Sequence, residues 1–194
     1  MSVRRLILIP LLFQIATAAA AATGWTVDRL MHTLAQNAGG TVHFTERKYL
    51  AILDTPVEST GTLVYRRPDH LERHALTPRP ESMVLDGNAL TLTRPSGSLH
   101  MDLRDYPDAA ALIESIRSTL AGDRAALERN YLLTLSGSQH AWTLDLSPSD
   151  TRIAALVVRI RIEGHGGQID TVSVLQADGD RSEMRITPIP AAGS

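Results

Sequence analysis

The stretch that decides the fold runs from Gly61 to Arg94 and reads GTLVYRRPDHLERHALTPRPESMVLDGNALTLTR. It consists of short runs of alternating apolar and polar residues, separated by residues that favour turns. This is the pattern of an antiparallel sheet with one apolar face. Leu63 and Tyr65 fall on one side of the first run, and Asp86-Gly87 supplies the positive φ angles of a tight hairpin. We therefore expect a meander of hairpins whose apolar side chains share one face.

The same alternation recurs along the rest of the chain and gives roughly nine to eleven strands in all. The segment between Leu50 and Ser59 interrupts it and reads as an irregular apolar connection that contains Pro56. Gly166-Gly167 and Asp178-Gly179 are placed to form further hairpins. Outside the first stretch, strands are expected within residues 41–49, 99–103, 131–135, 142–146, 158–163 and 182–186.

Two amphipathic helices interrupt the strands. The first has apolar residues at helical spacing from Val27 to Ala35, with Thr26 placed to cap it and Gly39-Gly40 to end it. The second begins at Pro107 and ends at Gly122, and Asp123 then caps a shorter helical piece that reaches about Arg129. The apolar stripe of the second helix consists of Ala109, Leu112, Ile113, Ile116 and Leu120.

Many strands with few, segregated helices favour an α+β fold in which a curved antiparallel sheet carries helices on one face. A sheet of this length tends to curl, and if it does not close it forms a half-barrel with an apolar concave face. The Val27 and Leu112 helices are available to cover that face. We therefore predict an unclosed antiparallel β half-barrel with helices over its concave side.

The N-terminus has the layout of a secretory signal peptide. Arg4 and Arg5 precede an apolar run from Leu6 to Ile15, and small residues follow from Ala18 to Ala22. The run is too short to span a bilayer, which needs about 20 residues. We expect cleavage near Ala22, so that residues 1–22 are the signal peptide, residues 23–194 are a single domain, and the mature protein is soluble and periplasmic.

Composition excludes several functional classes. The 194 residues include no cysteine, so the chain has neither the acylated Cys of a lipoprotein nor a disulfide or thiolate metal site. Without Arg4 and Arg5, 17 basic residues face 21 acidic ones, a formal charge of minus 4. No basic cluster is interleaved with aromatic residues, so we expect no nucleic-acid partner.

The first stretch also resembles the periplasmic outer-membrane lipoprotein carriers of the LolA family. The resemblance rests on Gly61, Arg66-Arg67-Pro68, Pro78 and the Asp86-Gly87 hairpin. It extends more loosely to WTLDLSP at 142–148 and QADGDRSEMRI at 176–186. FTER at 44–47, Leu-Asp-x-Pro at 53–56, DGNAL at 86–90 and LAGD at 120–123 resemble a LolA-like subgroup, some of whose members are encoded beside aryl polyene lipid synthesis and export functions.

The resemblance implies an unclosed barrel whose helices line and cover a hydrophobic cavity for acyl chains. Two features depart from the best-known carriers: Glu46 stands where they usually have Gln, and only 4% of the residues are aromatic. Leu, Ile, Val and Met would therefore line most of the cavity. The expected lining residues are Phe44, Leu63, Tyr65, Met83, Leu85, Leu90, Leu92, Leu99, Met101, Trp142 and Leu144.

Arg67 is the candidate for a latch. In the carriers, the Arg before that Pro holds the lid closed by hydrogen bonding to helical backbone, and Arg67-Pro68 matches it in position. Alternation places Arg67 on the side of Leu63 and Tyr65, where a guanidinium needs acceptors such as free carbonyls at a helix C-terminus. In the alternative interpretation, Arg67 ends its strand with its head group in water.

Other polar motifs are interpreted as structural. His70 and His74 lie on a predicted strand, where four residues span about 13 Å, too far to share one metal ion. Asp178 and Asp180 read as a hairpin, because the glycine that a calcium loop needs is missing. GHGGQ at 164–168 resembles an esterase oxyanion loop, with Ser136, Ser138 and His140 nearby in sequence, but the G-x-S-x-G elbow is absent.

We therefore predict a carrier, and not an enzyme, that needs no cofactor or metal. It would bind the acyl chains of a lipid or acylated protein and move them toward the outer membrane as a monomer, between an inner-membrane transporter and an outer-membrane acceptor. Two alternatives stay open: an accessory subunit of an envelope lipid exporter of the aryl polyene type, and a lipid esterase.

Overall fold

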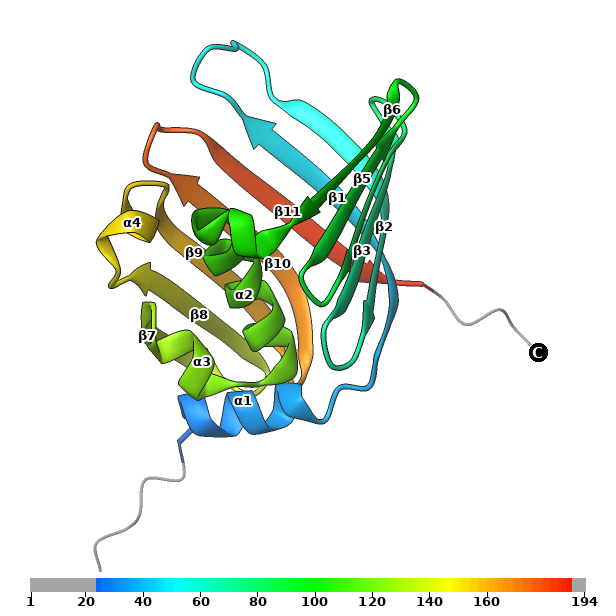
Figure 1. Ribbon diagram of the computed structural model, residues 1–194. Coiled ribbons are helices and arrows are strands. Elements are labelled where there is room, and N and C mark those ends of the chain that lie inside the picture. The colour runs from blue at the N-terminus through cyan, green and yellow to red at the C-terminus, as the bar shows by residue number, and fades with distance from the viewer. Residues whose placement is uncertain (1–23, 190–194) are drawn as a thin grey trace, which may run out of the picture.

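The computed structural model describes residues 24–189, in which eleven strands form one continuous antiparallel sheet. The sheet is strongly curved, and the helices lie on its inner side (Figure 1). The strands are β1 (Gly39–Tyr49), β2 (Val57–Arg66), β3 (His70–Thr77), β4 (Glu81–Asp86), β5 (Ala89–Arg94), β6 (Gly97–Asp102), β7 (Tyr131–Ser138), β8 (Ala141–Pro148), β9 (Val157–His165), β10 (Gln168–Gln176) and β11 (Arg181–Pro188).

The strand order is β6-β5-β4-β3-β2-β1-β11-β10-β9-β8-β7, so β6 and β7 are the two edges and the barrel is not closed. Neighbouring strands follow one another in sequence, except where β1 pairs with β11. The predicted unclosed half-barrel is therefore confirmed. The hairpins expected at Asp86-Gly87, Gly166-Gly167 and Asp178-Gly179 also form, between β4 and β5, β9 and β10, and β10 and β11.

The helices are α1 (Val27–Ala35), the single 3-10 turn η1 (Leu103–Asp105), α2 (Pro107–Ala121), α3 (Arg124–Glu128) and α4 (Thr151–Ala154). Thr26 caps α1 as expected, its side chain accepting from the backbone N–H of Arg29 at 3.3 Å. Gly122 ends α2 in the left-handed conformation with φ of 69°. Asp123 caps α3 by accepting from the backbone N–H of Ala126 at 2.9 Å.

Three local predictions were wrong. Gly39 and Gly40 do not end α1; the helix stops at Ala35 and the two glycines begin β1. Strand β2 already begins at Val57, inside the segment expected to be irregular. Helix α4 was not expected, because a helix of four residues leaves no periodic signal and only its cap, Asp150, is visible in the sequence.

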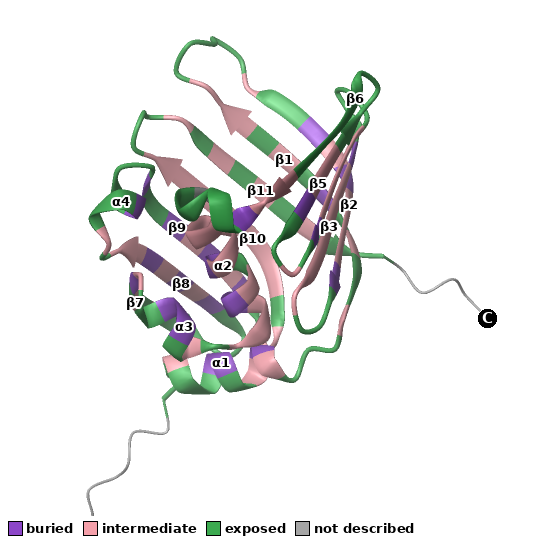
Figure 2. Ribbon diagram, in the orientation of Figure 1, coloured by how far each residue is buried: buried purple, intermediate pink, exposed green. Residues whose placement is uncertain are grey.

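Two clusters of buried apolar residues hold the helices on the concave face. The larger joins α1 and α3 to β7, β8 and β9, and the smaller joins η1 and the first turns of α2 to β3 through β6. Figure 2 shows buried segments on α1, α2, α3, β8 and β9, facing one another across the interior. The helical layer therefore contacts both walls of the half-barrel, and α2 lies between them.

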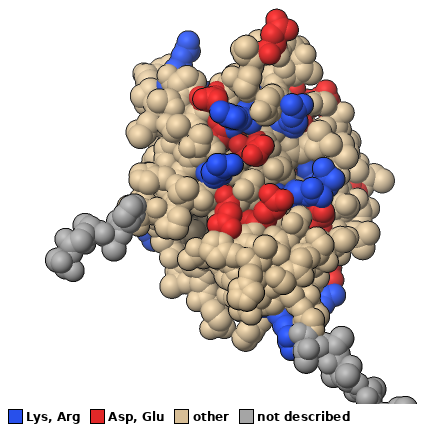
Figure 3. All heavy atoms as spheres, turned by 180° about the vertical axis from the view of Figure 1, so that it is seen from behind, with Lys and Arg blue, Asp and Glu red and all other residues tan. Residues whose placement is uncertain are grey.

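The convex face is polar and carries both charges. Figure 3 shows Lys and Arg interspersed with Asp and Glu on the side seen from behind Figure 1. Arg161 donates to both carboxylate oxygens of Asp145 at 2.9 Å, and these bonds hold the pKa of that carboxyl below its usual range. Arg47 and Glu58 form a more exposed ion pair at 2.8 Å. This face is therefore a solvated surface.

The expected signal peptide and its cleavage near Ala22 lie outside the described residues. In residues 24–189, none of the helices combines the length and the apolar character needed to cross a membrane.

Candidate functional site: the concave face of the sheet

Strand register determines which side chains share the concave face, because directly paired residues of antiparallel strands point to the same side. Phe44 pairs with Gly61, and Leu63 stands two residues further along β2 on the same face. Across β4 to β6, Met83 pairs with Leu92 and Leu92 with Leu99. Followed strand by strand, the register brings all eleven candidate lining residues to this face.

Six of these eleven side chains are already buried. Trp142 and Leu144 of β8 are buried in the cluster that includes α1 and α3. The indole of Trp142 donates to the backbone carbonyl of Gly166 at 3.0 Å. Its ring packs so closely on Gly164 that a Cβ on that residue would lie 2.5 Å from it. The buried candidates are Phe44, Tyr65, Leu85, Leu90, Trp142 and Leu144.

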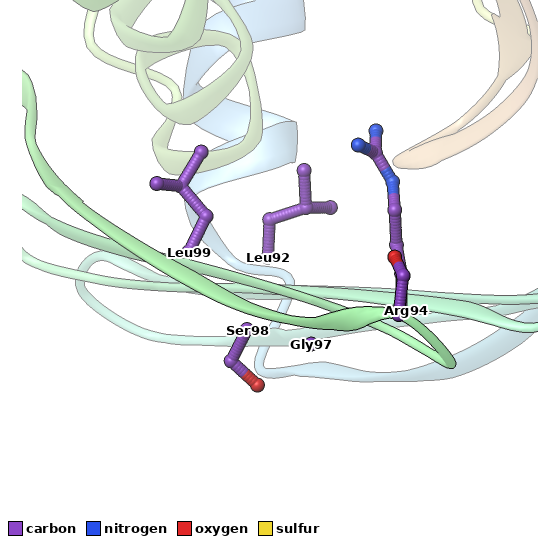
Figure 4. Close-up of a pocket in the computed structure, with 6 residues that line it drawn as sticks. Leu92, Arg94, Gly97, Ser98 and Leu99 are labelled. Carbon is purple, nitrogen blue, oxygen red and sulfur yellow. The ribbon is translucent and has the colours of Figure 1, made fainter.

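The other five candidates remain accessible and form what we call the trough: Leu63, Met83, Leu92, Leu99 and Met101. Leu99 is 52% exposed, a large fraction for an apolar side chain on the inside of a curved sheet. In Figure 4, Leu92, Leu99 and Arg94 extend from one side of β5 and β6, whereas Ser98 extends from the other. The trough therefore lies along the β2 to β6 wall.

Helix α2 carries an exposed apolar side chain. Ile116 lies on the same helical stripe as Leu112, Ile113 and Leu120, yet it is 45% exposed. The pocket at the end of the trough is small, about 220 Å³, which is below the roughly 300 to 1,000 Å³ of ligand sites. Its lining residues are Leu92, Arg94, Ser96, Gly97, Ser98 and Leu99.

Arg67 contacts the helical layer. It lies one residue beyond the end of β2 and is exposed, and its guanidinium donates to the carbonyl of Ala35 at 2.7 Å and to that of Asn37 at 3.5 Å. Ala35 is the last residue of α1, so the bond uses one of the free carbonyls at that helix end. Each interpretation made from the sequence thus describes part of the geometry: the side chain is solvated and it also bonds to a helix C-terminus.

A second arginine, which sequence reasoning missed, joins α2 to the wall. Arg117 donates to the carbonyl of Gly87, in the hairpin between β4 and β5, at 2.8 Å. The same guanidinium pairs with Glu114 one turn earlier on α2. In the sequence, Arg117 is visible only as a charged residue next to Ile116 of the apolar stripe. In the structure its side chain is mostly buried, and its bond to Gly87 forms only once α2 is docked.

Sequence reasoning also missed a group of charges on the concave face. Arg73 donates to Glu46 at 2.7 Å and to Ser59 at 3.2 Å, and its guanidinium lies 4.8 Å from the centre of the Phe44 ring. Glu81 accepts from Arg94 at 2.6 Å. The one signal in the sequence was strand parity, because Arg73 lies between Leu71 and Ala75 at a spacing of two and so shares the inner side of β3 with them.

His70 and His74 lie on the convex face. His70 and His74 belong to β3 as predicted, and each bonds to a different oxygen of Glu72, at 2.7 and 2.6 Å. These bonds lower the pKa of Glu72 to about 2. Ser82 contacts the other ring nitrogen of His74 at 3.0 Å. This ladder holds β3 to β4.

The chain is similar to several solved structures. Among solved structures, a LolA superfamily protein from Nitrosomonas europaea is 10% identical, with a TM-score of 0.44 over 86% of this chain and 93% of that one. The complex of MucA and MucB from Pseudomonas aeruginosa is 15% identical, with a TM-score of 0.43 over 86% of this chain and 57% of that one. LprF from Mycobacterium bovis is 10% identical, with a TM-score of 0.36 over 87% and 94%.

No curated protein matches the sequence. The family described as outer membrane lipoprotein carrier protein, LolA-like, matches residues 18–190, which include all of the described residues and both walls of the half-barrel. The chain therefore belongs to the LolA-like family.

Proposed function

We propose that this protein is a periplasmic carrier that holds the acyl chains of a lipid or acylated protein in the trough and delivers them toward the outer membrane. The observation that carries the proposal is the accessibility of Leu63, Met83, Leu92, Leu99 and Met101 on the concave face, where the other six candidate side chains are buried. Membership in the LolA-like family supports a binding role in place of a catalytic one.

Transfer of an alkyl chain from water to this surface supplies the binding energy. Each buried methylene contributes about 0.8 kcal/mol, so a chain of ordinary length is held tightly once α2 has moved to admit it. Release then needs an acceptor with a better apolar surface. Under this proposal the cargo comes from an inner-membrane transporter, with export of aryl polyene lipid as one candidate source, and goes to an outer-membrane acceptor.

The test is binding of a fluorescent fatty acid to the Leu92→Asp variant. A carboxylate on the trough floor should lower affinity at least tenfold, because burying an uncompensated charge beside an alkyl chain costs several kcal/mol. The matched control is Thr91→Asp, one residue earlier on the opposite face of β5. Equal affinities in the two variants, both folded by circular dichroism, would exclude the trough as the binding site.

A further inference from the structure

Charged side chains on an apolar concave face need an explanation. Five residues at the end of the trough farthest from α1, which we call the polar cluster, are Glu46, Ser59, Arg73, Glu81 and Arg94. Removing charges from water costs free energy that an ion pair recovers only in part, so such a group is weak evidence for stability. A role in recognising a ligand accounts for its position.

On three strands, a residue of the polar cluster stands next to an apolar residue of the same concave face. On β1, Glu46 follows Phe44 by two residues; on β4, Glu81 precedes Met83 by two; on β5, Arg94 follows Leu92 by two. Residues two apart on a strand lie on the same face about 7 Å from each other. An alkyl chain lying on Met83 and Leu92 would therefore place the atoms at its end against the cluster.

Gly61 leaves space for the long side chain of Arg73. Its guanidinium reaches from β3 across β2 to Glu46 of β1, passing over the ring of Phe44. The β2 residue paired with Phe44 is Gly61, where a Cβ would lie 1.9 Å from the carbonyl oxygen of His74 and 2.9 Å from the Phe44 ring. Glycine at this position leaves the space that a longer side chain would take.

Hydrogen-bond donors exceed acceptors in this region. Arg94 is paired through Nε alone, and within the described residues its two terminal NH2 groups have no partner. Arg73 uses one NH2 group for Glu46 and Ser59, and its other NH2 group is 3.7 Å from Glu81, beyond hydrogen-bond distance. Lys48, two residues beyond Glu46 on the same face, forms no ion pair in residues 24–189.

The charge count leads to the same conclusion. Lys48, Arg73 and Arg94 give three positive charges against two negative charges from Glu46 and Glu81. One unit of positive charge and several free N–H donors therefore remain beside the trough. A phosphate or carboxylate oxygen is the partner that guanidinium groups bind with the best geometry.

We propose that the polar cluster, with Lys48, binds the oxyanionic head group of an amphiphilic cargo whose alkyl chain occupies the trough. This inference rests on the proposed carrier function and specifies the chemical class of its cargo: a single-chain or multi-chain amphiphile with a phosphate or carboxylate at the head. Arg94, the more exposed of the two arginines, makes first contact, and Arg73 marks the inner limit of the head-group site.

The test compares dodecyl phosphate with dodecanol as competitors for the neutral probe phenylnaphthylamine. The wild-type protein should bind the phosphate about tenfold more tightly than the alcohol, the change expected from one charge-assisted contact. Arg94→Gln should bring that ratio close to one, because it lowers the affinity for dodecyl phosphate far more than the affinity for dodecanol. Lys48→Gln should lower the ratio in the same direction, with no ion pair to disturb.

The matched control is Arg47→Gln, which removes an Arg from an ion pair of similar exposure on the opposite face of β1 and should leave the ratio as in wild type. Equal affinity for phosphate and alcohol in the wild type would overturn the head-group site but leave the trough standing. Failure of the probe to bind at all would overturn the carrier function as well. Displacement of dodecyl phosphate by equimolar inorganic phosphate would identify a simple anion site and contradict the proposal.

Discussion

Arg67 joins the sheet to the helical layer at the corner where the chain passes from α1 into β1. Its two acceptors, the carbonyls of Ala35 and Asn37, lie on that connection. The side chain of Asn37 continues the linkage to the other wall, since its amide donates to the carbonyl of Gly167 at 3.3 Å. A latch at this corner would restrain α1 relative to both walls.

Replacement of Arg67 by Leu should therefore open the helical layer. A hydrogen bond to a charged group contributes about 1.5 to 3 kcal/mol when shielded, and because Arg67 is exposed we expect about 1 kcal/mol, or roughly a fivefold shift toward the open form. If opening exposes the trough to cargo, the variant should hold lipid longer. Transfer of a labelled acyl ligand from loaded protein to acceptor vesicles should be about fivefold slower.

Arg66→Leu is the control for this measurement. Arg66 is the neighbouring residue and is equally exposed, but it pairs with Glu72 on the convex face at 3.0 Å. It should transfer at the wild-type rate. Wild-type transfer by Arg67→Leu as well would mean that Arg67 is only a solvated strand-end residue.

At the scale of elements, α1 and α2 meet at Gly122. This residue has φ of 69°, and a Cβ there would lie 2.1 Å from the carbonyl oxygen of Met31 and 2.7 Å from the backbone nitrogen of Ala35. Both requirements, a left-handed backbone and the absence of a side chain, are met by glycine alone. The two helices of the lid therefore pack as a unit at this point.

Gly122→Ala should separate them. Left-handed strain alone costs about 1 to 2 kcal/mol, and the collision with α1 should raise the loss in the free energy of unfolding to about 3 kcal/mol or more. Gly166→Ala provides the comparison, since Gly166 has φ of 51° with open space at the Cβ position. If chemical denaturation gives equal losses for the two variants, the α1–α2 contact contributes nothing to stability.

The His70–Glu72–His74 ladder of β3 predicts how this part of the sheet responds to pH. Its hydrogen bonds hold the pKa of Glu72 at about 2 in the folded protein, below the ordinary 4.5. A depressed carboxyl pKa adds stability that is fully present above pH 4.5 and is lost as the pH falls toward 2. Glu72→Gln should therefore be less stable than wild type at pH 6, and the difference should shrink at pH 2.

Urea denaturation midpoints at the two pH values measure this effect. Glu58→Gln serves as the control, because Glu58 and Arg47 are both more than half exposed and such a pair contributes little. A Glu72→Gln deficit that is the same at pH 6 and pH 2 would contradict the role of the ladder.

At the scale of the whole molecule, the sequence predicted the sheet, its open edges and the inward side of its strands. These predictions succeeded because an apolar period of two is a local property, visible for example at Leu63 and Tyr65. The hairpins at Asp86-Gly87 and Asp178-Gly179 were likewise predicted from residues adjacent in the sequence. The extent to which helices cover the sheet is not a local property. Trp142 and Leu144, which the sequence placed among the residues lining the cavity beneath the helices, are packed against α1 and α3.

The polar contacts of the site depend on residues distant in sequence. Arg117 meets Gly87 only after α2 has docked, and Arg73 meets Glu46 only because β2 lies between β3 and β1 with Gly61 at the crossing. The spacing of apolar residues along the sequence contains no information about such pairs. The sequence could show that Arg73 points to the inner face, but its partners can be identified only from the register of β1, β2 and β3.

Together these features describe a half-barrel with one wall filled by helices and the other wall left apolar and reachable. The helices are tied to the sheet by an exposed hydrogen bond from Arg67 and by a mostly buried one from Arg117. The central claim is that an acyl chain occupies the space between α2 and the β2 to β6 wall.

The most direct test is photo-crosslinking with a fatty acid that carries a diazirine on its alkyl chain, followed by peptide mapping. We expect adducts on the strands that carry Leu63, Met83, Leu92 and Leu99 and on α2 near Ile116, and their loss in Leu92→Asp. Adducts confined to the convex face, or unchanged by that substitution, would contradict the central claim.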